Sequence, residues 1–431
     1  MNTDILIIGA GPAGLSCAYY LANMGYENVT VFDKNEVPGG MLTLGIPSFR
    51  LEKDVVNAEI EVLREMGVHF QCGVEIGKDL TIDQLREQGY KGFYLAIGAQ
   101  KSAPIGVPGE ELSGVYGGVD FLRRVNLGKK PRIGKKCAVI GGGNVAMDVC
   151  RTAIRLGAKD TYIIYRRSQA EMPADAEEVA EAMEEGVQFR FLSAPAEILG
   201  ENGKVKALKV ELMELGEPDA KGRRKPVGTG KFETIEVTSV IGAIGQRVDL
   251  GHIAPEAMAF NRNGTVQADG VTYQTAQPDV FAGGAATGAH DVARAIAEGR
   301  EAAISIHRFV HSNQSFVIGR DKRDYKPLAR SSVGVAIDEL ESAPRQAAEN
   351  GLLSDAQLHC EAGRCLGCGT VVLNEDQCIG CGICTTKCKF DAIHLEKVND
   401  THGRGYFRTL LTVASNAPAA GRRFVRKKLQ H

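Results

Sequence analysis

Residues 4–14 read DILIIGAGPAG, and this stretch decides the fold. Its apolar run ILII is typical of a strand that is buried on both faces of a parallel sheet. Gly9, Gly11 and Gly14 follow with the spacing of a turn that cradles a dinucleotide, and an alanine-rich helical stretch comes next. A further strand, VTVFD, ends at Asp33. The segment therefore predicts one strand–turn–helix–strand unit that binds a nucleotide.

The same unit returns with a constant offset of 132 residues, which takes Gly9 to Gly141 and Asp33 to Tyr165. The strand CAVI, the turn GGGNVA, a helix over 145–156 and the strand TYIIY repeat the first order. One glycine pattern alone is weak evidence, because unrelated α/β proteins also contain glycine-rich turns. Two copies in register, each between a strand and a helix, predict an α/β protein with two Rossmann-like dinucleotide-binding domains.

Each small residue of the pattern has its own physical task. The first glycine makes the tight turn, and the second lets backbone N–H groups approach a pyrophosphate. The third position needs a small residue for close packing of helix on strand, and Ala146 takes it in the second copy. The pyrophosphate then lies at the positive end of the helix dipole.

The residue that ends the second strand distinguishes the ligands of the two units. In the first unit it is Asp33, whose carboxylate can accept hydrogen bonds from ribose hydroxyls. In the second unit Tyr165 takes this place, and Arg166 and Arg167 follow. Guanidinium groups bind a 2′-phosphate in a bidentate manner, so the second site is predicted to prefer NADPH over NADH. The alternative is that both arginines belong to a solvated strand end.

The overall composition excludes several classes of protein. Lys and Arg number 51 against 53 Asp and Glu, a net charge of −2, which disfavours a nucleic-acid binder. No apolar run approaches the ~18 residues of a membrane span, and the start lacks the basic region of a signal peptide. A cytoplasmic protein is therefore expected, and its 11 cysteines need an explanation other than disulfides.

Eight blocks of the sequence agree together with one known family. They are GAGPAG (9–14), VPGGMLTLGIPSFRL (37–51), YLAIGA (94–99), VPGEELSGVYGGVDFL (107–122), VIGGGNVAMD (139–148), YRRSQAEMPA (165–174), AIGQ (243–246) and FAGGAATGAHDVARAIAEGREAA (281–303). Through these blocks the chain resembles the glutamate synthase small-subunit family of flavoproteins, which share the architecture of the pyridine nucleotide–disulfide reductases. The resemblance implies FAD in the first domain and NADPH in the second, with the second inserted within the first.

The expected domains follow from the repeat, the resemblance and the cysteine pattern. Residues 1–108 and 251–318 are predicted to form a discontinuous FAD-binding domain, and 109–250 an inserted NADPH-binding domain. Within the latter, the strand-rich segment 204–240 has a polar interruption at 218–230, which predicts a long hairpin with an exposed basic loop. Further domains are expected toward the end of the chain: a linker (319–355), a ferredoxin-like segment (356–400) and a basic tail (401–431).

The residues expected to contact the two nucleotides lie within the eight blocks quoted above, except Asp33 and Lys34, which end the first nucleotide-binding unit. They are Gly9, Gly11, Pro12, Ala13, Gly14, Asp33, Lys34, Gly40, Met41, Ile46, Gly98, Gly142, Gly143, Asn144, Val145, Ala146, Arg166, Arg167, Gly245, Gly284 and Ala285. No catalytic residue is predicted, because hydride transfer between nicotinamide and flavin needs no side-chain acid or base. Cys17 and Cys150 fall on predicted helices and are expected in the core.

Ala285 departs from the family pattern. The family usually has Gly-Asp here, and the aspartate bonds the ribityl chain of the flavin, whereas Gly284 is followed by Ala285 in this chain. A buried bond of this kind is worth about 1–3 kcal/mol, so its loss is expected to weaken FAD binding. Asp291 or backbone groups are the candidates to replace it.

Four cysteines near the C-terminal end have the spacing of a bacterial ferredoxin, CIGCGICTTKC, over residues 378–388. Three more precede them, so the predicted ligand set of a 4Fe–4S cluster is Cys378, Cys381, Cys384, Cys388, Cys360, Cys365 and Cys368. A two-cluster ferredoxin needs eight cysteines, so either one cluster is complete or a second borrows His359 or His394. A zinc ribbon is the alternative, but it leaves Cys384 and Cys388 without a role.

Together these features predict an electron-transfer subunit that passes electrons between NADPH, FAD, an iron–sulfur cluster and a partner chain in a hetero-oligomer. The resemblance implies that the partner is a glutamate synthase large subunit. Two alternatives stay open: a subunit of an electron-bifurcating NADPH:ferredoxin transhydrogenase or hydrogenase-type complex, and a non-catalytic nucleotide-sensing or scaffold subunit. The basic tail is either a solvated end or a docking segment for an acidic partner face.

Overall fold

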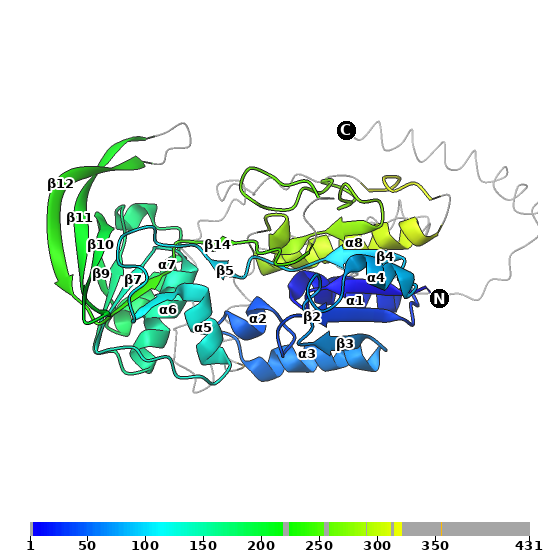
Figure 1. Ribbon diagram of the computed structural model, residues 1–431, viewed down its shortest axis with the longest axis horizontal. Helices are drawn as coiled ribbons and strands as arrows, with labels where there is room; N and C mark the ends of the chain where they lie inside the picture. Colours follow the sequence, from blue (N-terminus) through cyan, green and yellow to red (C-terminus); the bar gives the residue numbers. More distant parts are fainter. Residues whose placement is uncertain are drawn as a thin grey trace, which may run out of the picture. The chain divides into compact units, whose positions relative to one another are not determined.

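Strand β1 (Ile5–Ile8) is the centre of a five-stranded parallel sheet, and all four of its residues are buried. The order of strands is β15 (Val280–Ala282), β4 (Gly92–Leu95), β1, β2 (Val29–Asp33) and β3 (His69–Cys72). The computed structural model describes residues 3–218, 224–253, 258–289, 291–311, 314–320 and Asp355. We call the part built around this sheet the first lobe (Figure 1).

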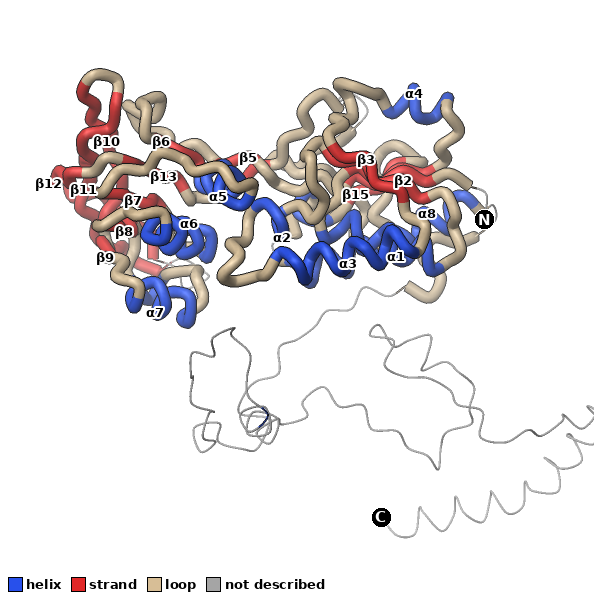
Figure 2. Tube along the Cα trace, turned by 90° about the horizontal axis from the view of Figure 1, so that it is seen from below, coloured by secondary structure: helices blue, strands red, loops and turns tan. Residues whose placement is uncertain are grey.

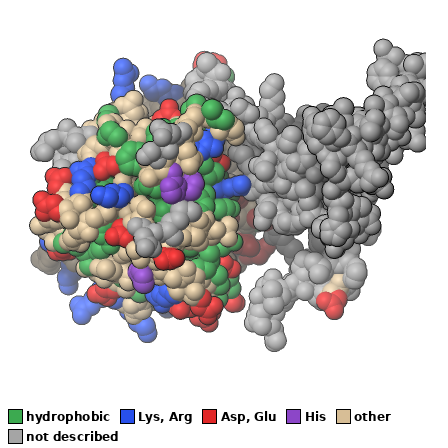
Figure 3. All heavy atoms as spheres, turned by 90° about the vertical axis from the view of Figure 1, so that its right-hand side faces the viewer, with side chains coloured by type: hydrophobic (Ala, Val, Ile, Leu, Met, Phe, Trp, Pro, Cys, Tyr) green, Lys and Arg blue, Asp and Glu red, His purple; other side chains and the backbone are tan. Residues whose placement is uncertain are grey.

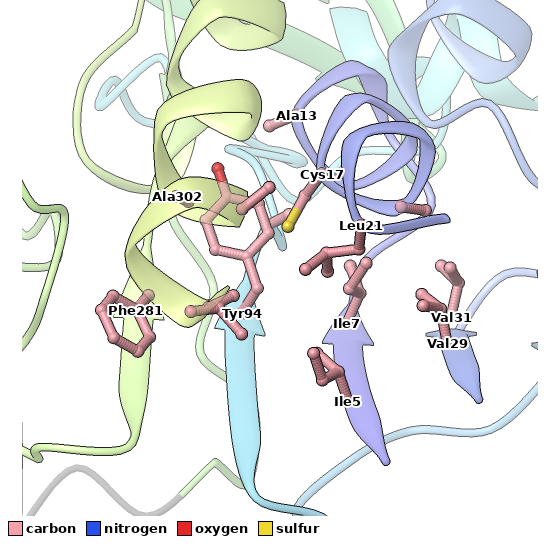
Figure 4. Close-up of a cluster of buried hydrophobic side chains, with 14 of the residues drawn as sticks. Ile5, Ile7, Ala13, Cys17, Leu21, Val29, Val31, Tyr94, Phe281 and Ala302 are labelled. Carbon is pink, nitrogen blue, oxygen red and sulfur yellow. The ribbon is translucent and has the colours of Figure 1, made fainter. Parts of the chain in front are cut away.

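Helices cover one face of the first sheet. Helix α1 (Pro12–Asn23) packs along α8 (Val292–Val310); α1 lies against β1 and β2, and α8 lies against β4 and β15. From the strands, Ile5, Ile7 and Tyr94 meet Cys17 and Leu21 of α1 in a fully buried cluster (Figure 4). Because successive strand residues point to opposite faces, Leu6 and Ile8 join a second cluster on the other side. The near-continuous apolar strands thus follow from burial on both faces.

A second parallel sheet has the same plan and forms the second lobe. The order of strands is β6 (Val115–Gly117), β13 (Ser239–Gly242), β7 (Lys136–Ile140), β8 (Asp160–Ile164) and β9 (Gln188–Arg190). Helices α5 (Gly118–Asn126), α6 (Asn144–Arg155) and α7 (Ala176–Glu184) contribute to the core on one face. The observed elements of the second unit begin and end within one or two residues of the predicted ones.

A three-stranded antiparallel sheet covers the other face of the second lobe. It consists of β10 (Ser193–Glu201), β11 (Lys204–Pro218) and β12 (Arg224–Glu236), and Figure 1 shows β11 and β12 side by side. The predicted hairpin is therefore confirmed, but the predicted loop over 218–230 is too long, because pairing resumes at Arg224. Strand β12 is an edge strand, where Pro226 and Gly228 are tolerated.

The second sheet is inserted in the sequence between strands of the first. Strands β1 to β4 precede it and β15 follows it. The chain passes from the first lobe to the second at β5 (Lys101–Ser102) and returns at β14 (Gln246–Arg247), and these two short strands pair in antiparallel orientation. The predicted α/β class with two Rossmann-like units is confirmed. The assignment of the lobes to FAD and NADPH, with the domain limits given above, stays a prediction.

The remaining helices of the first lobe are short or peripheral: α2 (Met41–Leu44), α3 (Lys53–Glu65) and α4 (Ile82–Glu87). Figure 2 shows α2 beside α5 of the second lobe. Of the described helices, none is long and apolar enough to cross a membrane. The predicted segment 356–400 and tail 401–431 lie outside the described residues, as does all of the linker except 319–320 and Asp355. Acidic and basic side chains are interspersed on the face seen in Figure 3.

Candidate functional site: two nucleotide cradles and a shared cavity

The first glycine turn is built by close backbone contacts. Gly9 has a φ of +111°, and a Cβ there would lie 2.3 Å from the carbonyl oxygen of Ala96. A Cβ on Gly14 would lie 1.9 Å from the oxygen of Gly9, so helix and strand pack as the motif requires. A Cβ on Gly11, in contrast, would meet nothing nearer than 3.8 Å. Gly11 precedes α1 without a capping side chain, which leaves room and N–H donors for a pyrophosphate.

Next to this turn lies a cavity of about 550 Å³ that both lobes line. Its wall brings together many of the predicted contacts: Gly11, Pro12, Ala13, Gly40, Met41, Ile46, Gly98, Val145, Gly245, Gly284 and Ala285. The second lobe contributes Val119, Leu122, Val145 and Asp148. The apolar lining with few polar groups is typical of a cofactor pocket. A ligand in it would therefore touch the helices of both lobes.

An ion pair joins the lobes at the edge of this cavity. Nη1 of Arg50, in the first lobe, lies 2.9 Å from Oδ1 of Asp148 on α6, and Nη2 contacts Glu178 on α7. Asp148 is only 5% exposed, and burial raises the pKa of its carboxyl group to about 6, while Arg50 acts in the opposite direction. Nearby, the amide of Asn126 on α5 donates to the carbonyls of Leu44 and Ile46.

A smaller hollow of about 40 Å³ lies at the end of β2 and is lined by Gly9, Asp33 and Lys34. Asp33 is only 3% exposed, and its carboxylate accepts 2.8 Å hydrogen bonds from the backbone N–H groups of Ala10 and Asn35. It also accepts a 2.7 Å bond from the Asn35 amide. The carboxylate thus fastens the glycine turn to the strand end, and Oδ2 keeps acceptor capacity for a ribose hydroxyl.

The chain around Ala285, also on the wall of the large cavity, is held from behind. Ala285 lies in the 3₁₀ helix η3 (Gly284–Ala286) and lines the cavity. The buried carboxylate of Glu298 on α8 accepts a 2.8 Å hydrogen bond from the N–H of Gly284. Asp291 also lines the cavity, but its Oδ1 caps α8 by accepting from Arg294 N–H. The loop geometry is therefore fixed by groups other than a carboxylate at position 285.

The second glycine turn repeats the geometry of the first. Gly141 has a φ of +145°, and a Cβ there would lie 2.3 Å from the carbonyl oxygen of Ala243. A Cβ on Gly143, which precedes α6, would meet nothing nearer than 3.9 Å, so this turn also has an open cradle. Ala146 is fully buried under it. The side chain of Asn144 is engaged by Asp175, to which it both donates and accepts.

The two predicted arginines lie on the turn beside this cradle. The ring of Tyr165 packs on Gly142, whose Cβ would come within 2.6 Å of it, and the Tyr165 hydroxyl donates to the Glu171 carbonyl. Arg166 is exposed and Arg167 is half-buried. Within the described part of the chain, no acidic side chain forms an ion pair with either arginine. Their charge is thus available to an anion that enters the cradle.

Of the four cysteines in the described part of the chain, three are buried. Cys17, Cys137 and Cys150 are buried, and burial raises the pKa of the Cys137 thiol to about 12. The expectation that Cys17 and Cys150 are core residues is confirmed. No metal-binding group of three or more His, Cys, Asp or Glu exists among the described residues. All seven predicted cluster ligands, Cys360 to Cys388, lie outside them.

Sequence reasoning missed several residues that line the large cavity: Leu122, Asp148, Arg247, Asn263 and Thr265. Asp148 had a usable signal, because it follows Val145 by three residues and therefore lies on the same face of α6. Asn263 and Thr265 come from a loop far away in the sequence, and no local pattern reveals them. The residues present fit both nucleotides: two open glycine cradles, a wide cavity, and an arginine pair at only one of the two strand ends.

Comparison with known proteins adds the family. The model of the pyridine nucleotide-disulphide oxidoreductases matches residues 3–301, and that of the 4Fe-4S binding domain matches 371–394. The chain is 44% identical over 327 residues to the NADP(+)-dependent formate dehydrogenase subunit beta of Moorella thermoacetica, covering 74% of this chain and 46% of that protein. It is 40% identical over 319 residues to a putative glutamate synthase [NADPH] small chain of Cereibacter sphaeroides, covering 71% and 76%.

A solved structure supports the fold at greater distance. FprA of Mycobacterium tuberculosis in complex with NADPH has a TM-score of 0.61 at 19% identity, covering 72% of this chain and 85% of that one. The chain spans less than half the length of the formate dehydrogenase subunit. The two family matches, together with the similarity to the glutamate synthase small chain, confirm the resemblance, the 4Fe–4S segment and the predicted cofactors FAD, NADPH and a 4Fe–4S cluster.

Proposed function

Because the chain belongs to the pyridine nucleotide-disulphide oxidoreductase family, we propose that it is an NADPH-dependent electron-transfer subunit that serves a partner enzyme. It would take a hydride from NADPH and deliver single electrons through its C-terminal cluster. The observation that carries the proposal is the cavity that both lobes line. A nucleotide held by the second lobe and a flavin held by the first would meet there.

In this proposal each of the two glycine cradles holds one nucleotide. In the first lobe, Gly11 and the start of α1 would hold the FAD pyrophosphate, with Asp33 at the ribose. In the second, Gly143 and the start of α6 would hold the NADPH pyrophosphate, with Arg166 and Arg167 at the 2′-phosphate. Bound FAD supplies the conversion between two-electron hydride chemistry and single-electron transfer.

The side chains of the chain itself would bind and orient rather than react. Met41, Ile46 and Leu122 line the cavity with apolar surface from both lobes and would help to exclude water from the place where the cofactors meet. The Arg50–Asp148 pair would hold α6 against the first lobe at that place. No described side chain has to give or take a proton for hydride transfer, so we assign no catalytic residue.

Sequence similarity supports a role as one subunit among several. The relatives named above are a subunit beta and a small chain, both described by their names as parts of larger enzymes. We propose that the partner of this chain is a glutamate synthase large subunit or a dehydrogenase subunit that exchanges electrons with the cluster. Purification of the complex without oxygen, followed by identification of the co-eluting chains, distinguishes these partners.

Reduction by NADPH in the absence of oxygen tests the proposal. We expect the flavin absorbance to bleach with NADPH much faster than with NADH, and an artificial one-electron acceptor to be reduced in turn. A protein that binds flavin but is not reduced by NADPH would contradict the proposal. Such a result would favour the nucleotide-sensing or scaffold alternative instead.

A further inference from the structure

Beyond the two arginines of the motif, a third arginine reaches the same turn from the antiparallel sheet. Strand β12 begins at Arg224, whose carbonyl oxygen accepts a 2.9 Å hydrogen bond from Nε of Arg167. The guanidinium of Arg224 lies 4.0 Å from the carboxylate of Glu171, at the far end of the turn. The hairpin therefore bends over the turn that follows β8, although Arg167 and Arg224 are far apart in the sequence.

The hydrogen bond from Arg167 positions its guanidinium group. Nε is used for the backbone of Arg224, and the two terminal nitrogens have no partner among the described residues, so they can form a fork toward an anion. The backbone of the turn is held as well, because the N–H of Leu192 donates to the carbonyl of Arg167. A side chain fixed in this way loses less entropy when it binds a phosphate.

Three arginines lie on the turn or approach it. Arg166 and Arg167 lie on the turn itself and Arg224 reaches it from β12; in the described part of the chain, only Arg224 of the three pairs with a carboxylate, that of Glu171. Its Oε2 accepts hydrogen bonds from the backbone N–H and the hydroxyl of Ser168, and the Ser168 hydroxyl lowers the pKa of Glu171. An anion that enters the turn would therefore be attracted by all three guanidinium groups.

We propose that Arg224 completes the 2′-phosphate site of NADPH, so that the hairpin β11–β12 acts as a clamp on the adenosine end of the coenzyme. This inference rests on the proposed function, which assigns the second cradle to NADPH. Arg166 and Arg167 come from the motif at the end of β8, and the third guanidinium comes from the inserted sheet. Coenzyme selectivity in this chain thus depends on a segment that the nucleotide-binding motif does not contain.

Binding of 2′,5′-ADP and 5′-AMP to the purified full chain, measured by calorimetry, tests the proposal because these two ligands differ only in the 2′-phosphate. Arg224→Ala should weaken 2′,5′-ADP binding about tenfold, the value of one charge-assisted hydrogen bond, and leave 5′-AMP binding unchanged. The matched control is Lys231→Ala, which removes a charge from the same strand without an ion pair to the turn, and it should change neither ligand by more than about twofold.

A second variant keeps the test independent of damage to the fold. Glu171→Gln retains an acceptor for Ser168 but removes the competing charge, so 2′,5′-ADP should bind more tightly. The proposal is overturned if Arg224→Ala leaves 2′,5′-ADP binding unchanged, or weakens both ligands equally. If the unaltered protein binds 2′,5′-ADP no better than 5′-AMP, the assignment of the second cradle to NADPH fails, which is a different result.

Discussion

Arg50 of the first lobe and Asp148 of the second lie 2.9 Å apart, and Asp148 also lines the cavity that the lobes share. The pair connects a loop of one nucleotide unit to the helix that begins at the glycine cradle of the other. The pair belongs to a larger group of charged side chains, because the Glu178 carboxylate also contacts Arg50 and lies 4.0 Å from the guanidinium of Arg151. The relative position of the lobes at the cavity thus depends on buried charges.

Removal of Arg50 should destabilise the contact between the lobes. Arg50→Ala leaves Asp148 buried without its partner, and such a change costs about 3 kcal/mol. The free energy of unfolding, measured with urea, should therefore fall by about the same amount. The exposed pair of Lys136 and Glu236 provides the control, because solvent screens it and Lys136→Ala should therefore cost much less than Arg50→Ala. Equal effects of the two substitutions would contradict a structural role for the Arg50–Asp148 pair.

The same carboxyl group predicts a pH dependence. Burial raises the pKa of Asp148 to about 6 from an ordinary 3.8, so the folded protein keeps a proton that the unfolded chain releases in this range. The contribution of Asp148 to the free energy of unfolding should therefore fall as pH rises from about 4 to 6, by about 3 kcal/mol.

Comparison with Asp148→Asn isolates this contribution. Carboxyl groups whose pKa is lowered in the folded protein make the free energy of unfolding rise with pH instead. Asp269 is one of them, because it accepts backbone hydrogen bonds from Thr272 and Val271. The difference in stability between the unaltered protein and Asp148→Asn should shift in favour of the variant as pH rises from 4 to 6, and then stay level. A difference that does not change with pH would show that Asp148 titrates normally.

Coenzyme preference should depend on the arginine pair. Replacement of Arg166 and Arg167 by Gln should raise the Kd for NADPH by ten- to a hundredfold and leave the Kd for NADH nearly unchanged. Flavin reduction followed by stopped-flow absorbance measures both. In the unaltered protein, equal rates with NADH and NADPH would refute the assignment of the second cradle.

Ala285 should limit the retention of FAD. The side chain lines the cavity where the family pattern has an aspartate, and Glu298 already fixes the loop behind it. Ala285→Asp should slow the loss of flavin during dialysis, since a carboxylate bonded to a hydroxyl adds about 1–3 kcal/mol. The fluorescence of released flavin reports the result. If the unaltered protein keeps its FAD through long dialysis, other contacts compensate for the missing carboxylate.

Local patterns predicted the parts of the fold that depend on nearby residues. The apolar segment VTVFD indicated a strand, and the structure has β2 at these same residues. The hairpin was predicted too, but its loop was placed over Gly228 and Gly230, which in fact lie on an edge strand. Pairing with Met213 across the sheet decides this, and such a contact leaves no local signal.

In the candidate site, too, local motifs could be predicted from the sequence and long-range contacts could not. The glycine motifs indicated both cradles, and the blocks of the family resemblance indicated most of the cavity wall. The contact of Arg167 with Arg224 and that of Arg50 with Asp148 each join segments that are far apart in the sequence. Asp33 was expected to serve a ribose, but its bonds to Ala10 and Asn35 arise from the packing of the turn on the strand end. Such pairings become visible only in three dimensions.

The central claim is that electrons from NADPH reach a 4Fe–4S cluster in this chain, and EPR spectroscopy after addition of NADPH without oxygen tests it most directly. The unaltered protein should give the signal of a reduced 4Fe–4S cluster, with about four irons per chain for one cluster or about eight for two. In Cys381→Ser at least one such signal should be lost, while the flavin absorbance still bleaches with NADPH. Zinc in stoichiometric amount without iron, or a cluster that NADPH never reduces, would contradict the account.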